Sequence, residues 1–186
     1  MYQETYNEKI QIIPWEERFS QDFIELSVEW LVKYVRVEPA DEALLYHPHE
    51  TILDKGGMIF FANDGVKNVG TVTMLKLEDG VYELAKLAVT ETCKGRHIGD
   101  KLIQAALGFA KENHAKKVIL FTNSRLGPAI HLYHKYGFID VPLVDNEYEE
   151  SDMKMALSIG NVDEETIRKY IREQEEESEQ ESRTLK

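Results

Sequence analysis

The chain has 186 residues, a length that suits one domain with a sizeable core and is short for two. Apolar residues make up 42% and charged residues 30%, and the formal net charge of −12 argues against nonspecific nucleic-acid binding. No apolar run approaches the roughly 20 residues that span a bilayer, the first residues lack a signal-peptide pattern, and the single cysteine, Cys93, cannot form an internal disulfide. We therefore expect a cytoplasmic protein that binds neither nucleic acid nor membranes and whose easier partners are cationic small molecules or basic peptides.

The first half of the chain predicts a strand, a helix and an antiparallel meander. Residues 9–13 alternate apolar and polar side chains, as in a strand, and Ser20 is a candidate cap for a helix over residues 21–35. That helix carries two apolar stripes, so one stripe can rest on a sheet while the other lines a cleft, meets the next segment or is also core. Turns then separate three strands, at residues 58–62, 66–75 and 81–89.

The second half predicts two helices and three strands. A helix over residues 98–113 leads to the nearly all-apolar run 117–122, which we expect to lie parallel to residues 81–89 after a right-handed crossover. Pro128 and Gly137 bracket another helix. Closing strands follow at residues 138–141 and 153–157. The predicted fold class is mixed α/β, with a domain over residues 1–160 and a solvated acidic tail over residues 161–186.

The turn Lys94-Gly-Arg-His-Ile-Gly99 is a candidate anion site. It opens a helix, whose unpaired N–H groups and positive dipole end favour a phosphate, and Lys94 and Arg96 add cationic side chains. The turn is neither a Walker loop nor a GxGxxG dinucleotide motif. We therefore predict a diphosphate site here, with a plain connector as the alternative.

Glu83 and Tyr133 are candidates for proton transfer. Simple strand alternation places Glu83 on the face of four apolar residues, Val81, Ala85, Leu87 and Val89, where desolvation would suit a base that works near neutral pH. An edge-exposed or salt-bridged glutamate is the alternative. Lys86, on the opposite face, is expected to reach solvent. Tyr133 is expected to point inward from its helix. Its side chain then either takes part in the chemistry or is an ordinary core residue.

No metal site is expected. His131 and His134 lie three residues apart on one helix, but no second Cys, His or Asp group is obviously paired with them. His47-Pro-His49 fits a loop better than a ligand pair.

Two stretches together resemble a known family. Residues 94–99 occupy the pattern Gln/Arg-x-x-Gly-x-Gly/Ala, and Asn123 is followed by Ala129-Ile-His-Leu-Tyr-His-Lys-Tyr-Gly-Phe138. These are similar to the motifs of the GNAT superfamily of acyl-CoA-dependent N-acetyltransferases. The resemblance covers roughly residues 9–158. Within the superfamily, the sequence is similar to bacterial members of unassigned substrate, some of which are fused to MarR-type regulators.

The resemblance implies a GNAT-like fold, a mostly antiparallel sheet of about six or seven strands with a parallel central pair and about four flanking helices. It implies that the two central strands splay apart to admit acetyl-CoA and that backbone N–H near Leu87 or Ala88 polarises the thioester. It also implies that Tyr133 protonates the leaving thiolate and that Glu83 accepts the proton of the amine. The cofactor-binding residues it implies are Leu87, Ala88, Val89, Lys94, Gly95, Arg96, His97, Ile98, Gly99, Asp100, Asn123 and Tyr133.

Two residues depart from the family pattern. Lys94 replaces Gln or Arg, which keeps a charge but loses bidentate geometry. His97 replaces a glycine, so its backbone either keeps a negative φ or pays for the left-handed region, and we expect weaker cofactor binding.

The resemblance therefore predicts an acetyl-CoA-dependent N-acetyltransferase that acts on a primary amine, with a small cationic molecule favoured over a protein amine. A non-catalytic CoA-binding sensor or partner module and a nucleotide-binding regulator are the alternatives. Members of the family often form homodimers, which the residues themselves do not show.

Overall fold

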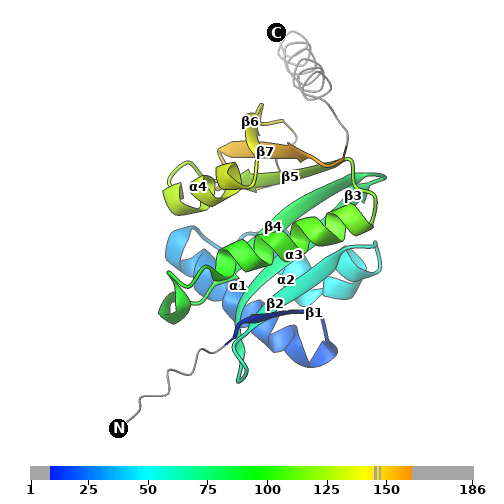
Figure 1. The fold of residues 1–186 in the computed structure, drawn as a ribbon. Helices are drawn as coiled ribbons and strands as arrows, with labels where there is room; N and C mark the ends of the chain where they lie inside the picture. The colour runs from blue at the N-terminus through cyan, green and yellow to red at the C-terminus, as the bar shows by residue number, and fades with distance from the viewer. Residues whose placement is uncertain (1–8, 145, 147, 161–186) are drawn as a thin grey trace.

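A seven-stranded sheet forms the centre of the computed structural model, which describes residues 9–144, 146 and 148–160 (Figure 1). Its strand order is β1-β2-β3-β4-β5-β7-β6, and only β4 and β5 are parallel neighbours. The strands are β1 (Gln11–Pro14), β2 (Met58–Asn63), β3 (Asn68–Glu78), β4 (Val81–Val89), β5 (Lys117–Thr122), β6 (Ile139–Val141) and β7 (Met153–Ser158). The predicted mixed sheet with a parallel central pair is confirmed. The predicted acidic tail lies outside the described residues.

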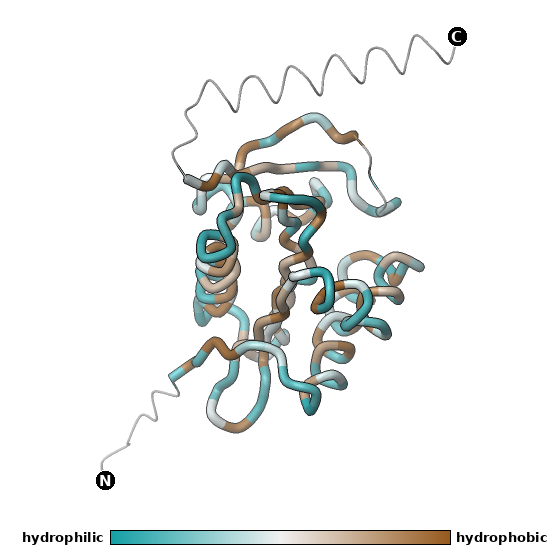
Figure 2. The backbone as a smooth tube through the Cα atoms, turned by 90° about the vertical axis from the view of Figure 1, so that its right-hand side faces the viewer, coloured by the Kyte–Doolittle hydropathy of each residue, from teal (hydrophilic) through white to brown (hydrophobic). Residues whose placement is uncertain are grey.

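Helices cover both faces of this sheet. The α-helices in the described part of the chain are α1 (Ser20–Tyr34), α2 (Pro39–Tyr46), α3 (Ile98–Glu112) and α4 (Gly127–Lys135), with short helical turns η1 (Glu17–Phe19), η2 (His49–Leu53) and η3 (Glu91–Cys93). Figure 2 shows the apolar strands between α3 on one face and α1 with α2 on the other. None of the described helices is long and apolar enough to cross a membrane.

Helix α3 lies against the sheet through one apolar stripe. Ile98, Leu102, Ile103, Ala106 and Ala110 are buried at helical spacing. Gly70 of β3 allows the close approach, because a Cβ there would lie only 3.0 Å from Cδ1 of Leu102. This packing sets the start of α3 beside the end of β4.

The N-terminal half differs from prediction in two places. Ser20 is the first residue of α1 rather than its cap: Phe19 takes the cap position, and its side chain makes no capping hydrogen bond. Helix α2 was not predicted. It begins with a capping box, in which Glu38 and Asp41 each accept the other's backbone N–H, and Pro39 stands in its first turn.

Candidate active site

Strand β4 contains a β-bulge at Lys86 and Leu87. In the ladder with β3, β4 takes three steps from Ala85 to Ala88 where β3 takes two. Lys86 has a φ of +51°, a left-handed conformation that costs a residue other than glycine about 1–2 kcal/mol. The bulge interrupts the ladder and so leaves backbone here that β3 does not pair.

The bulge also changes which way the side chains of β4 face. Ala85, two residues after Glu83, packs with the core beneath α1, whereas Leu87 and Val89 pack with the core beneath α3. The prediction that Leu87 and Val89 share the face of Glu83 was therefore wrong. Alternation with a period of two holds only while no residue is inserted into the strand.

Strands β4 and β5 separate soon after they begin. Their parallel pairing covers Val81 to Glu83 on β4 and Lys117 to Ile119 on β5, although β4 continues to Val89 and β5 to Thr122. Figure 1 shows the opening between them on the side of α4. Residues of the carboxyl-terminal halves of both strands, Leu87 and Ala88 on β4 and Phe121 and Thr122 on β5, line a cleft.

Two adjoining cavities occupy this cleft. The first, which we call the helix cavity, has a volume of about 430 Å³ and lies between the end of β4, the start of α3, and α1 and α4. The second, which we call the polar cavity, is smaller, about 100 Å³, and is bounded by α1, the start of α2, β4, β5 and the segment before β7. Four residues line both cavities: Trp30, Leu87, Leu126 and Tyr133.

The turn before α3 forms part of the wall of the helix cavity. Gly95 has a φ of +78°, and His97 caps α3 with a φ of +56°. The backbone at His97 therefore takes the costlier of the two predicted conformations, and the residue occupies the N-cap position just before the first residue of α3. A Cβ on Gly95 would meet no atom within 4 Å, so space remains beside the turn.

The start of α3 is tied to α4 by Asp100. Its carboxylate accepts hydrogen bonds from the Lys135 ammonium and, at 2.9 Å, from the Tyr136 hydroxyl. The bond from Lys135 lowers the pKa of Asp100. This contact sets the start of α3 relative to the helix that carries Tyr133.

Tyr133 lies where the two cavities meet. It is 7% exposed, and its ring packs edge to face on Phe138 with 6.0 Å between centroids. After the helix ends, N–H of Phe138 donates to the carbonyl of Tyr133 and N–H of Gly137, at a φ of +92°, donates to that of His134. Burial raises the pKa of Tyr133 to about 12, so its phenol carries a proton at neutral pH.

The polar cavity collects buried charge. Glu83 is 6% exposed and lines it, as do Glu38 and Asp41. Lys86 was expected to reach solvent, but its side chain is only 8% exposed, because its ammonium pairs with Asp41 and lies 5.3 Å from the centre of the Tyr148 ring. Burial of the Lys86 ammonium is favourable only because it is paired with the Asp41 carboxylate, since an unpaired buried charge is strongly destabilising.

A sequence profile described as the Acetyltransferase (GNAT) family matches residues 14–138, well over half of the chain. The chain belongs to the GNAT family. The resemblance of its two motifs to that family is thereby confirmed.

The solved structures that resemble this GNAT chain share its fold at low sequence identity. An acetyltransferase of the GNAT family from Staphylococcus aureus Mu50 superposes with a TM-score of 0.74 at 20% identity, over 82% of this chain and 100% of the other. The spermidine N-acetyltransferase from Vibrio cholerae, solved with CoA and spermine, gives a TM-score of 0.62 at 17% identity, over 82% and 96%.

A curated relative is a mycothiol acetyltransferase from Corynebacterium glutamicum (strain R). It is 29% identical over 84 residues, which is 45% of this chain and 29% of the relative. The chain therefore matches less than a third of that relative's length.

Most of the predicted cofactor residues of this GNAT chain come together. The helix cavity is lined by Leu87, Val89, Lys94, Gly95, His97, Ile98, Gly99, Asp100 and Tyr133. Ala88 and Asn123 line the polar cavity, whereas Arg96 lines neither of these two cavities and has Nη1 3.6 Å from Sγ of Cys93. The binding roles of all these residues stay predictions.

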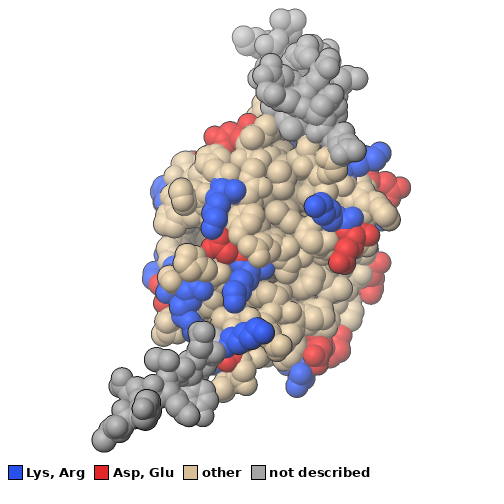
Figure 3. Space-filling view, viewed as in Figure 1, with Lys and Arg blue, Asp and Glu red and all other residues tan. Residues whose placement is uncertain are grey.

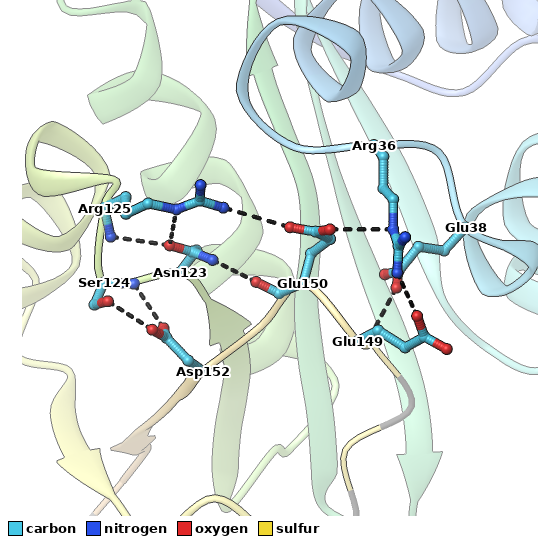
Figure 4. Close-up of polar contacts among 8 residues, drawn as sticks. All are labelled: Arg36, Glu38, Asn123, Ser124, Arg125, Glu149, Glu150 and Asp152. Carbon is cyan, nitrogen blue, oxygen red and sulfur yellow. Dashed lines mark hydrogen bonds and ion pairs between the residues drawn. The ribbon is translucent and has the colours of Figure 1, made fainter.

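Asn123 bonds to the segment before β7 (Figure 4). Its Nδ2 donates to the backbone carbonyl of Glu150 at 2.5 Å, and its Oδ1 accepts from the backbone N–H of Arg125 at 3.0 Å. The Glu150 carboxylate lies between two guanidinium groups, 3.1 Å from Nε of Arg36 and 3.4 Å from Nη2 of Arg125. These bonds fasten one wall of the polar cavity.

Sequence reasoning missed the charged residues contributed by distant segments. Glu38, Asp41 and Glu150 line the polar cavity with Glu83, yet each is separated from β4 by at least 40 residues. The spacing Glu38-Pro39-x-Asp41 could have predicted the helix start, although nothing in it indicates that Asp41 meets Lys86.

Proposed function

We propose that this GNAT protein transfers the acetyl group of acetyl-CoA to a primary amine of a small, cationic molecule by direct attack on the thioester. The observation that carries the proposal is the place of Tyr133. Tyr133, whose phenol carries a proton, lines both the helix cavity, with the residues that begin α3, and the polar cavity, with four carboxylate residues. A donor thioester and an acceptor amine would meet there.

The helix cavity suits the diphosphate and pantetheine of CoA. Unpaired N–H groups at the start of α3, with the dipole of that helix, favour an anion beside Gly95 and Gly99. Basic side chains gather on the side of the molecule where α3 begins, despite the net charge of the chain (Figure 3). The exposed basic residues near that end include Lys94, Arg96, Lys101 and Lys135. CoA would supply the activated acetyl group.

The bulge in β4 suits the acetyl end. Backbone N–H near Leu87 or Ala88 would donate to the thioester oxygen and stabilise the negative charge that develops there during attack. The splayed ends of β4 and β5 leave room for the acyl group beside these donors.

Tyr133 and Glu83 would move the two protons of the reaction. As the bond from nitrogen to the acetyl carbon forms and the bond to sulfur breaks, Tyr133 protonates the departing thiolate. Glu83 accepts the proton of the amine, directly or through a water, because an amine with a pKa of about 10 is mostly protonated at neutral pH. Each proton transfer is worth on the order of 10²–10⁴-fold in rate, and positioning of both reactants supplies more.

The polar cavity favours a cationic acceptor. Four carboxylates line it, those of Glu38, Asp41, Glu83 and Glu150, against the two cationic side chains of Arg36 and Lys86. Aromatic rings of Trp30, Phe121 and Tyr148 add surfaces that attract an ammonium group. A structural neighbour from Vibrio cholerae is a spermidine N-acetyltransferase solved with spermine, which agrees with this acceptor class.

A thermal-shift comparison tests the cofactor. Acetyl-CoA and CoA should each raise the melting temperature at millimolar concentration, and ATP should raise it much less, because ATP lacks the pantetheine arm that fills the cavity. Equal stabilisation by ATP would instead favour a nucleotide-binding regulator. No stabilisation by either CoA compound would contradict the proposal.

A further inference from the structure

Helix α1 is joined to the turn before α3 by a cluster of four side chains, Lys33, Tyr34, Glu91 and Lys94, which we call the mouth cluster. The Lys94 ammonium lies 2.6 Å from Oε1 of Glu91 and donates to the hydroxyl of Tyr34. That hydroxyl donates to Glu91 at 2.9 Å, and Lys33 lies 2.5 Å from the other oxygen of Glu91. Glu91 is thus the centre of the cluster.

The mouth cluster stands at the wall of the helix cavity. Tyr34 of α1 and Lys94 of the turn before α3 both line that cavity. The ring of Tyr34 lies 4.4 Å from the Lys94 ammonium and 5.4 Å from the ring of Trp30. An anion bound by the turn before α3 would therefore meet Lys94 beside its present partners.

The cluster is electrostatically favourable without a ligand. Hydrogen bonds from Lys33 and then from Lys94 lower the pKa of Glu91 to about 2, so Glu91 is ionised at any working pH. The side chains of Lys94 and Glu91 are 40% and 37% exposed, so their attraction is modest and can be exchanged for another partner. A diphosphate offers Lys94 more negative charge than a single carboxylate does.

We infer that Glu91 and Tyr34 compete with the cofactor's diphosphate for the Lys94 ammonium, and so set the affinity of this protein for CoA. This inference rests on the proposed function, because it needs CoA in the helix cavity. Glu91 and Tyr34 are positioning residues that act through Lys94. The free energy needed to break the contacts of Lys94 with Glu91 and Tyr34 lowers the affinity for CoA. This effect adds to the weaker diphosphate binding expected when lysine replaces Gln or Arg at this position of the motif.

Isothermal titration calorimetry of the full chain with CoA tests the competition. Glu91→Gln should bind CoA about two- to five-fold more tightly than wild type, as expected for the loss of a partly exposed ion pair. Tyr34→Phe, which changes no charge, should bind about two-fold more tightly. Lys94→Met should bind about five- to ten-fold more weakly.

A matched control separates competition from a general change of charge. Glu29 lies in the same region and accepts the Thr90 hydroxyl and the N–H of Glu91, at 3.0 and 3.1 Å, without contacting Lys94. Glu29→Gln removes the same charge and should change the affinity for CoA less than two-fold. In the Lys94→Met background, Glu91→Gln should then have no larger effect than Glu29→Gln has.

The inference is overturned if Glu91→Gln binds CoA no more tightly than Glu29→Gln, or if its gain persists in full without Lys94. If Glu91→Gln folds poorly, Tyr34→Phe provides an independent test. In that case, Tyr34→Phe binding CoA no more tightly than wild type counts against competition. Absence of CoA binding by the wild-type chain would overturn the proposed function as well, whereas tight wild-type binding with unchanged variants overturns this inference alone.

Discussion

The buried ion pair between Lys86 and Asp41 gives a sharp prediction about stability. Their side chains are 8% and 2% exposed, and the second oxygen of Asp41 accepts the N–H of Glu38 at 2.9 Å. Lys86→Met keeps the volume of the stem but leaves a buried carboxylate without its cation. Removal of one partner from a buried pair costs about 3–5 kcal/mol in the free energy of unfolding. For a domain of this size, that lowers the melting temperature by about 6–20 °C.

Urea denaturation followed by circular dichroism measures this cost. Lys76→Met is the matched control, since Lys76 pairs with Asp79 at 3.5 Å between side chains that are 35% and 104% exposed, and it should cost less than about 0.5 kcal/mol. If Lys86→Met costs no more than this control, the carboxylate of Asp41 is solvated and the argument from burial fails.

Three further predictions concern Tyr133, His97 and Gly70. The raised pKa of Tyr133 contributes stability that is complete well below pH 10 and is lost as the pH rises through 12, so wild type should lose about 2 kcal/mol more than Tyr133→Phe between pH 10 and pH 12 in urea denaturation. His97→Gly should leave the free energy of unfolding unchanged or raise it by up to about 1 kcal/mol, because glycine adopts a φ of +56° without strain. His97→Val, which resists that φ, should lower the free energy of unfolding by about 1–2 kcal/mol. Equal effects of the two substitutions would contradict the claim that the backbone at His97 is strained. Gly70→Ala should cost about 1–3 kcal/mol, because its Cβ would lie 3.0 Å from Leu102 and 3.1 Å from the carbonyl of Ala88, and a cost near zero in the same assay would show that α3 can shift.

The local signals in the sequence located the central strands accurately. Strand β4 has the predicted bounds of 81 and 89, and β5 those of 117 and 122, because alternation and an unbroken apolar run are strong patterns over such lengths. Pro128 and Gly137 likewise bracketed α4, since Gly137, with a φ of +92°, lies just past the end of the helix as predicted. Helix α2 was missed because its capping residue, Glu38, is not one of the usual Ser, Thr, Asp or Asn signals.

The candidate site was predictable only where one continuous segment forms it. The turn before α3 and Tyr133 follow from local motifs, and Glu83 is buried as expected. Because of the bulge at Lys86, Leu87 lies on the opposite face of the sheet from the one predicted. A lysine at this position gives no local sequence signal that the strand contains an extra residue. The burial of Lys86 depends on Asp41, 45 residues away in sequence, which only the tertiary structure brings near.

Turnover of acetyl-CoA by the wild-type chain and by Tyr133→Phe tests the central claim most directly. CoA release would be followed across a panel of amines, polyamines, amino acids and aminoglycosides, with CoA affinity measured on both proteins. We predict that at least one cationic amine is acetylated and that Tyr133→Phe lowers kcat by about 10²–10⁴-fold while it binds CoA as wild type does. Acetylation that is equally fast in both proteins would contradict the role of Tyr133, and CoA binding without turnover of any amine would favour a sensor.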